Sequence, residues 1–173
     1  AADLIAQAEH DPEAVPSLVA CSNDFVDEVR SAVLQQLETL PTRETARAAF
    51  ENSFSVVVSD REEAVEVCDR VAPEHLQVMV EDAASFAARL TNYGGLFVGS
   101  KSAEVFGDYG VGPNHVLPTG GTGRFSGGLS VKDFLVTRTW MELDDPTEVI
   151  EDTARLARLE GLEGHARAAE KGR

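Results

Sequence analysis

A loop broken by three glycines and two prolines carries a carboxylate and an imidazole between Gly107 and Thr119. Glycine and proline at this density exclude a regular helix and a central strand. Irregular backbone of this kind is typical of segments whose side chains converge on a ligand. Asp108 could bind a cation, and His115 could bind a metal or donate to a substrate carboxylate or carbonyl. The alternative for Asp108 is a turn residue that ends a helix.

Two further pairs of polar residues could do chemistry. Gln7 and His10 are three residues apart, so on a helix they share a face and could reach one ion, although a solvent-facing polar surface fits equally. Glu74 and His75 follow a proline at the expected start of a strand. Neighbours on a strand face opposite sides, so both enter one site only if the preceding turn includes Glu74. Such a pair could transfer protons in two steps, and a surface turn is the other interpretation.

The remaining motifs give little. His165 lies in a helical pattern near the C-terminus, and alone such a histidine is more often a surface residue than a ligand. The segment 121–126 matches a dinucleotide-binding glycine motif only in part, because its last position is serine and no clear strand precedes it, so we reject that interpretation. Phosphate-loop, H-E-x-x-H and G-x-S-x-G motifs are absent from the sequence.

The elements that must position these residues alternate between strands and helices. Apolar, β-branched runs predict strands at 15–20, 54–58, 75–80 and 96–99. Helical periodicity predicts helices at 1–9, 25–40, 41–50, after Ser59 and at 82–90, with a helical turn at 102–106. This alternation predicts an α/β fold with a Rossmann-like, mostly parallel sheet.

The pattern changes after Gly128, where two further helices are expected at 146–159 and 162–171. They form a small helical C-terminal appendage. We therefore divide the chain into an α/β part, 1–128, which carries most of the candidate site residues, and a helical segment, 129–173.

Composition limits the partners and the compartment. A net charge of −15 argues against nucleic acid and anionic membranes as partners. No apolar run is long enough for a membrane span, and no signal peptide is visible. The two cysteines, Cys21 and Cys68, form no metal or redox motif, so we expect small core residues in a reducing, cytoplasmic compartment. An acid-rich, lysine-poor surface suits a halophilic source as well as an ordinary acidic protein.

Five segments, taken together, resemble the C-terminal portion of histidinol dehydrogenase. They occur in the family's order and at matching separations, they extend over essentially the whole chain, and the long glycine-rich loop is the most specific of them. They are 7–10, 72–76, 107–119, 125–131 and 160–165. Because the first residues are helical in pattern without a cap or an initiator methionine, we expect the chain to be the back part of a longer protein.

The resemblance implies an oxidoreductase of histidine biosynthesis. Members of the family oxidise L-histidinol to L-histidine through the aldehyde, with two NAD and a zinc ion. By motif position, the catalytic bases would be His75, which takes the alcohol proton, and Glu74, which activates water. The resemblance assigns the other site residues as zinc ligands that also contact the substrate, namely Gln7, His10, Asp108 and His165, and as substrate contacts alone, namely His115 and Glu160.

The resemblance also implies an intertwined homodimer, in which the C-terminal segment with His165 reaches the partner's active site. The family's front part, which carries most of the NAD contacts, is absent from this sequence. Two alternatives therefore stay open: a non-catalytic zinc- or ligand-binding domain, and an unrelated α/β interaction domain whose polar residues lie at the surface.

Overall fold

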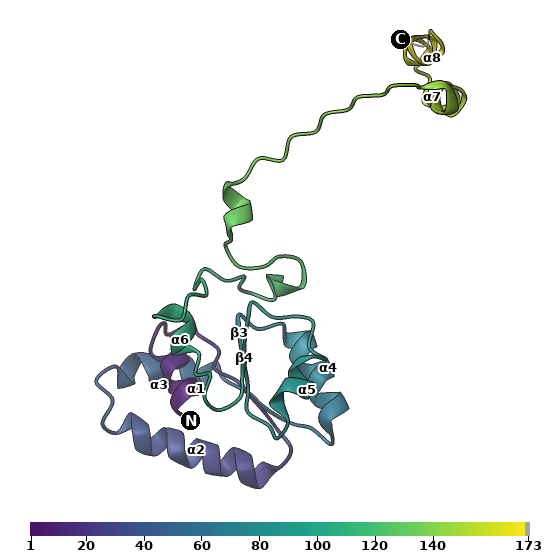
Figure 1. Cartoon of the computed structure of the whole chain (residues 1–173). Coiled ribbons are helices and arrows are strands. Elements are labelled where there is room, and N and C mark those ends of the chain that lie inside the picture. Colours follow the sequence, from purple (N-terminus) through teal and green to yellow (C-terminus); the bar gives the residue numbers. More distant parts are fainter. Residues whose placement is uncertain (172–173) are drawn as a thin grey trace. The chain divides into compact units, whose positions relative to one another are not determined.

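Two pairs of short parallel strands form the framework of the first part of the chain. The computed structural model describes residues 1–171. Strand β1 (Leu18–Ala20) pairs with β2 (Ser55–Val57), and β3 (His75–Val78) pairs with β4 (Gly95–Val98) (Figure 1). Both ladders are parallel, and helices separate the strands along the chain. The predicted α/β class with parallel strands is therefore confirmed.

The described chain divides into two units, Ala1–Phe134 and a second that begins at Leu135. The sequence pattern placed the boundary a few residues earlier, at 128, and the last two residues of the predicted C-terminal segment lie outside the described residues. No helix in the described part is both long and apolar enough to cross a membrane.

Three helices before the second strand share a core of their own. Helices α1 (Ala2–Ala8), α2 (Asn23–Leu37) and α3 (Arg43–Glu51) pack against one another. Helix α2 begins at Asn23, two residues before the predicted start at 25, because the Ser22 side chain caps it by accepting a hydrogen bond from the Phe25 backbone N–H. Alanines at the contacts let the helices approach closely. The buried residues are Ile5, Ala8, Val33, Leu37, Ala46 and Ala49.

A second core joins the strands to α4 (Arg61–Val71) and α5 (Ala83–Ala87), which lie beside β3 and β4 in the view of Figure 1. Its buried members include Val78, Phe86 and Cys68. The prediction that both cysteines are core residues holds for Cys68 and is wrong for Cys21, which is exposed. Cys21 follows the last residue of β1, in the turn that leads to the α2 cap, so its side chain lies outside the packed strand.

An irregular segment follows β4. It begins with the short helix α6 (Val105–Asp108), slightly later than the helical turn expected at 102–106, and contains the 3₁₀ turns η1 (Thr122–Arg124) and η2 (Val131–Phe134). Gly110 and Gly112 adopt φ angles of +92° and +114°, which residues with a Cβ rarely take. These two positions explain part of the loop's glycine content.

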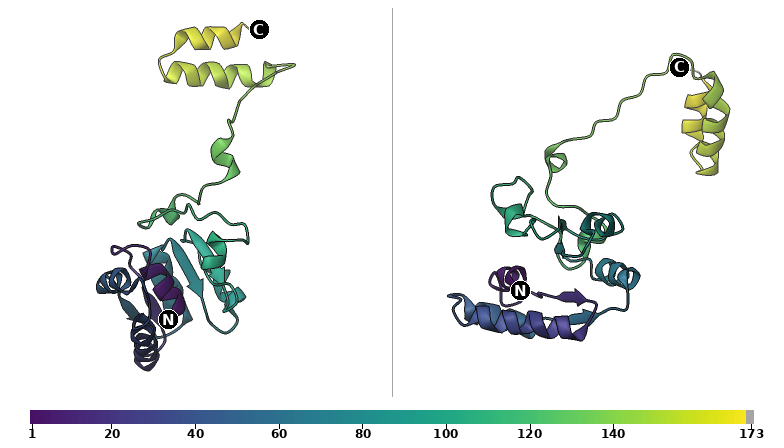
Figure 2. Two further views of the ribbon diagram at one scale, coloured as in Figure 1. Left: turned by 90° about the vertical axis from the view of Figure 1, so that its left-hand side faces the viewer. Right: turned by 60° about the horizontal axis from the view of Figure 1, so that its bottom comes forward.

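The second unit contains two helices, α7 (Thr147–Leu159) and α8 (Glu163–Glu170), which Figure 2 shows as an antiparallel pair. Gly161 ends α7 at a φ of +76°, as the predicted break requires. Its N–H donates to the Arg158 carbonyl, and the next N–H, of Leu162, donates to the Ala157 carbonyl. This is the Schellman arrangement, in which two otherwise unpaired carbonyls at the helix end find donors.

Candidate functional site

A buried carboxylate forms the centre of the candidate site. Glu104 occupies the N-cap position directly before α6, and it is only 4% exposed. Its Oε1 lies 3.2 Å from Nε2 of His75, the first residue of β3. The angles between the two groups do not make a hydrogen bond, and both atoms are buried without a partner. Buried polar atoms nearly always have a hydrogen-bond partner. Two neighbouring buried atoms that both lack one therefore indicate a place where a ligand can bind.

Gln7 brings α1 to the same carboxylate. Its Nε2 donates to Glu104 Oε2 at 2.5 Å, across 97 positions of sequence. An amide has one donor end and one acceptor end. Because the amide nitrogen faces Glu104, the Gln7 oxygen can coordinate a cation or accept a hydrogen bond from another donor.

Asp108 completes the cluster from the other end of α6. It lies four positions after Glu104, so the two carboxylates share one side of the helical turn. Ligand atoms of His75, Glu104 and Asp108 all lie within 4.8 Å of one another. The structure therefore brings together Gln7, His75 and Asp108, which the resemblance had assigned to one site.

Electrostatics show that the cluster carries an excess of negative charge. Burial raises the pKa of Glu104 above its ordinary value, and the nearby Asp108 raises it further. The charges of His75 and His10 and the hydrogen bond from Gln7 lower the pKa of Glu104, but the net direction is upward. His10, whose charge contributes to this shift, is itself exposed.

Glu74 lies in the turn directly before β3, the position that a shared site requires. Its carbonyl accepts a hydrogen bond from Gly95 N–H at 2.7 Å, and the Pro73 carbonyl accepts one from Gly94 N–H at 2.9 Å. A Cβ on Gly94 would lie 2.5 Å from the Glu74 oxygen. The glycine pair therefore lets the β4 backbone approach the turn closely and fixes the place from which the Glu74 side chain leaves.

The other predicted site residues are His115, Glu160 and His165. His115 is exposed in the irregular segment, and the cluster does not include it. Asn114 anchors its surroundings, since its amide donates to the Leu129 carbonyl and its oxygen accepts from Val116 N–H. Glu160, the C-cap of α7, and His165, in α8, are exposed residues of the second unit.

Glu104 was missed by the sequence analysis. One signal was available, because a carboxylate four residues before Asp108 shares a helical face with it. The spacing alone does not show burial, and most paired acidic residues on helices face water. Only the contacts with Gln7 and His75 distinguish Glu104 from an ordinary surface residue.

The donors present fit a zinc ion. An imidazole, a carboxylate and an amide oxygen suit a cation of borderline softness. The excess of acidic groups supports the same conclusion, because a bound cation would supply the missing positive charge. The residues present therefore agree with a metal centre between α1, β3 and α6.

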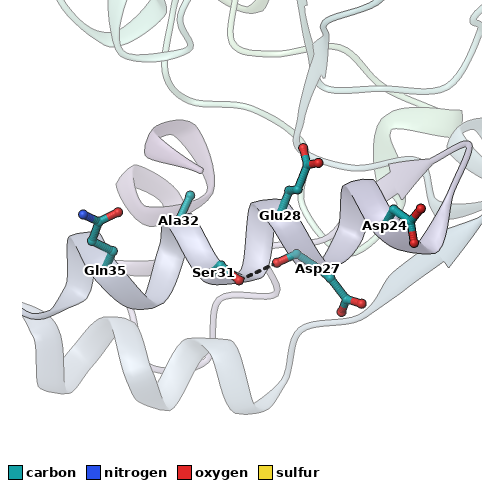
Figure 3. Close-up of a pocket in the computed structure, with 6 residues that line it drawn as sticks. All are labelled: Asp24, Asp27, Glu28, Ser31, Ala32 and Gln35. Atoms are coloured by element: carbon teal, nitrogen blue, oxygen red, sulfur yellow. Dashed lines mark hydrogen bonds between the residues drawn. The ribbon is translucent and has the colours of Figure 1, made fainter.

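A separate surface hollow lies along α2 (Figure 3). It is lined by Asp24, Asp27, Glu28, Ser31, Ala32 and Gln35. The one hydrogen bond drawn among them, from Ser31 Oγ to the Asp27 carbonyl, is internal to the helix. None of the predicted site residues borders this hollow, and we assign it no role.

Comparison with known proteins gives a consistent result. The family model for histidinol dehydrogenase matches residues 1–172. Histidinol dehydrogenase of Geobacillus kaustophilus is 47% identical over 98% of this chain and 41% of its own length, and that of Thermus thermophilus is 44% identical over 97% and 41%. A crystal structure of histidinol dehydrogenase from Elizabethkingia anophelis superposes with a TM-score of 0.92, at 29% identity, over 98% of this chain and 40% of that one.

The chain thus spans about two fifths of the length of the relatives it matches. The matches cover nearly all of this chain, including every residue of the cluster around Glu104. From the family match, the parallel α/β framework and the sequence identities together, the chain belongs to the histidinol dehydrogenase family.

Proposed function

We propose that the chain is the C-terminal portion of a zinc- and NAD-dependent oxidoreductase that converts L-histidinol to L-histidine. The observation that carries the proposal is the convergence of Gln7, His75 and Asp108 on buried Glu104 in a chain of this family. These residues come from three elements far apart in sequence. A structural cluster would pair its polar atoms internally, whereas this one leaves two of them unpaired.

Four residues would hold the zinc ion, namely Gln7, His10, Asp108 and His165. When bound, zinc supplies a Lewis acid that orients the amino and imidazole nitrogens of the substrate. The first three of these residues lie in the first unit, where Gln7 and Asp108 both lie close to the Glu104 carboxylate. His165 lies in the second unit, and its exposed imidazole is available to a metal.

His75 would act as the base for the alcohol. As the carbon gives hydride to NAD, the imidazole takes the hydroxyl proton, and the product of this first oxidation is the aldehyde. Glu74 would then take a proton from the water that adds to the aldehyde, and the hydrate gives a second hydride to NAD. His115 and Glu160 would contact the substrate and orient it.

We further infer a cytoplasmic homodimer whose active sites are shared between chains. Exposed apolar side chains support an interface, because large exposed apolar surfaces mark places of association. In the second unit Leu159 is 77% exposed and Trp140 is 83% exposed. Sedimentation of the protein as a monomer at micromolar concentration would contradict this part of the proposal.

A steady-state assay with histidinol, NAD and zinc tests the function. We expect NADH to form in a two-to-one ratio to histidine, with the complete natural protein that carries these 173 residues. The same assay on the 173-residue chain distinguishes the proposed function from its main alternative. If this chain binds zinc but forms no NADH, it is a non-catalytic zinc-binding domain.

Zinc affinity tests whether the polar residues belong to a metal site at all. We expect His10→Ala and Asp108→Ala each to weaken zinc binding by at least about tenfold, as is typical when a metal ligand or its partner is removed. Asp27→Ala, an exposed carboxylate on α2, is the matched control and should leave the affinity unchanged. Unchanged affinity in all three variants would favour an interaction domain with no metal centre.

A further inference from the structure

Glu104 touches two residues with different proposed roles. One carboxylate oxygen accepts from the Gln7 amide, and the other lies 3.2 Å from His75 Nε2. Gln7 belongs to α1 and His75 to β3, while Glu104 is the N-cap residue directly before α6. A single buried side chain therefore joins a zinc-binding residue and the proton acceptor.

We propose that Glu104 is a positioning residue that fixes the orientation of both the Gln7 amide and the His75 ring. This inference rests on the proposed function, since it assigns Glu104 a part in zinc binding and proton transfer. It gives Glu104 no direct contact with the substrate. Its effect passes through the two side chains that it holds.

The first effect concerns the flip of the Gln7 amide. An amide can present either its oxygen or its nitrogen, and only the oxygen can bind a cation. Glu104 accepts from the Gln7 nitrogen, so it selects the flip in which the oxygen points away from Glu104. A carboxylate is a strong partner for this purpose, because a hydrogen bond to a charged acceptor is about twice as strong as a neutral one.

The second effect concerns the proton on His75. Neutral imidazole carries its proton on one of two nitrogens, and the hydrogen bond made by one nitrogen determines the state of the other. The Glu104 oxygen lies 3.2 Å from Nε2, so a proton on Nε2 faces a buried carboxylate that stabilises it, although the angles do not form a hydrogen bond. The proton is then held on Nε2, and the lone pair on Nδ1 faces away from Glu104, ready to accept the proton of the alcohol.

Two other roles for Glu104 make different predictions. A purely structural carboxylate would affect stability without changing zinc affinity or turnover of the folded protein. A direct zinc ligand would contribute its own bond, so its loss would add to the loss of Gln7. A double-mutant cycle distinguishes these cases, because residues that act through one contact are non-additive.

The experiment uses the complete natural protein that carries these residues and measures zinc affinity by competition with a chromogenic chelator. We expect Glu104→Gln to weaken zinc binding by about 10- to 100-fold, the usual loss when the partner of a metal ligand is changed. The double variant Gln7→Ala/Glu104→Gln should bind zinc as weakly as Gln7→Ala alone. Glu66→Gln, an exposed glutamate on α4, is the matched control and should bind zinc normally.

Turnover supplies the second readout. At saturating zinc, Glu104→Gln should lower kcat for histidinol oxidation by at least about tenfold with a smaller change in KM, because base catalysis of this size depends on orientation. Glu104→Asp keeps the negative charge and should recover part of the lost kcat. If Glu104→Gln folds poorly, Glu104→Asp replaces it in the double-mutant cycle on zinc affinity.

The outcomes separate the proposals. Additive losses of zinc affinity in the cycle would overturn the positioning role, and so would a lowered melting temperature with unchanged zinc affinity and kcat. If the unmodified protein forms no NADH from histidinol, the proposed function fails. The cycle on zinc affinity would still decide whether Glu104 acts through Gln7.

Discussion

Gly107 in α6 lies directly against the ring of Phe97 in β4. A Cβ on Gly107 would be 2.7 Å from the Phe97 Cε1 atom, closer than real side chains approach. The same ring lies 6.0 Å from the imidazole of His75, measured between ring centroids. Phe97 therefore sets the distance between α6, which carries Glu104 and Asp108, and β3, which carries His75.

Filling this contact should disturb the site without removing any polar residue. We expect Gly107→Ala to lower the free energy of unfolding by about 1–3 kcal/mol, since overpacking in a close contact costs this much. Because α6 must shift away from β4, zinc affinity should fall as well. Both effects are measured on one preparation, by urea unfolding and by chelator competition.

A second substitution tests whether the ring is the cause. In Gly107→Ala/Phe97→Leu the smaller side chain leaves room for the added methyl group, and zinc affinity should recover relative to Gly107→Ala. Gly127→Ala is the control, because a Cβ there would meet no atom within 4 Å. Equal zinc affinity in Gly107→Ala and Gly127→Ala would show that α6 is not positioned by Phe97.

The turn before β3 allows a sharper comparison between two neighbouring glycines. A Cβ on Gly94 would meet the Glu74 backbone oxygen at 2.5 Å, whereas one on Gly95 would meet only side chains, at 3.0 Å or more. Side chains can move aside more easily than a backbone that is part of a ladder. We expect Gly94→Ala to destabilise the protein by about 2 kcal/mol more than Gly95→Ala does, within the range for overpacked positions.

The same pair also reports on Glu74. If Glu74 activates water for the second oxidation, Gly94→Ala should slow the oxidation of the aldehyde more than that of the alcohol. Stopped-flow measurements with each substrate give the two rates. If Gly94→Ala slows both oxidations equally, the turn does not act through the proposed role of Glu74 in the second oxidation.

The residues that could be predicted from the sequence are those embedded in distinctive local strings. His75 follows Ala-Pro-Glu, and Asp108 opens a loop rich in glycine and proline, so their types and neighbours were informative. The parallel framework was also predictable, because apolar strands alternate with amphipathic helices. The ends of the strands were less predictable. The apolar run at 15–20 predicts a strand of six residues, but only Leu18–Ala20 pair with β2.

Glu104 was not predictable, because its role depends on burial. Local sequence gives its spacing from Asp108, but the contacts with Gln7 and His75 span 97 and 29 positions and arise only when α1, β3 and α6 meet. The prediction that Cys21 is a core residue was wrong for a related reason. Its apolar neighbours suggested a core position, and the early end of β1 left it in an exposed turn.

Asp69 at the end of α4 holds the segment that leads into β4. Its carboxylate accepts hydrogen bonds from Thr91 N–H, Thr91 Oγ1 and Asn92 N–H, at 2.9, 2.6 and 3.0 Å. Partial burial alone would raise the pKa of Asp69, but these hydrogen bonds outweigh it and hold the pKa below its ordinary value. Asp69→Ala should therefore lower the free energy of unfolding near neutral pH by about 1–2 kcal/mol.

The pH dependence follows from the sign of the shift. A carboxyl group whose pKa is lowered on folding stabilises the protein above the pKa of the unfolded chain, and this stabilisation is lost as the pH falls through the lower folded value. The difference between the unmodified protein and Asp69→Ala should be constant above about pH 5 and shrink below about pH 4. Asp69→Asn, which retains one acceptor without a charge, should show a smaller loss. A difference that grows on acidification would refute the assignment.

The proposed sharing of active sites between two chains can be tested by mixing two inactive variants. If His165 serves the partner's site, a hybrid dimer of His75→Asn and His165→Asn chains has one site with both histidines intact and one site with neither. Random exchange of subunits gives half hybrids, so the mixture should recover about a quarter of the unmodified activity. The activity is measured as NADH formed from histidinol after subunit exchange in mild denaturant. If His165 serves its own chain, every site in the mixture lacks one histidine, and no activity returns.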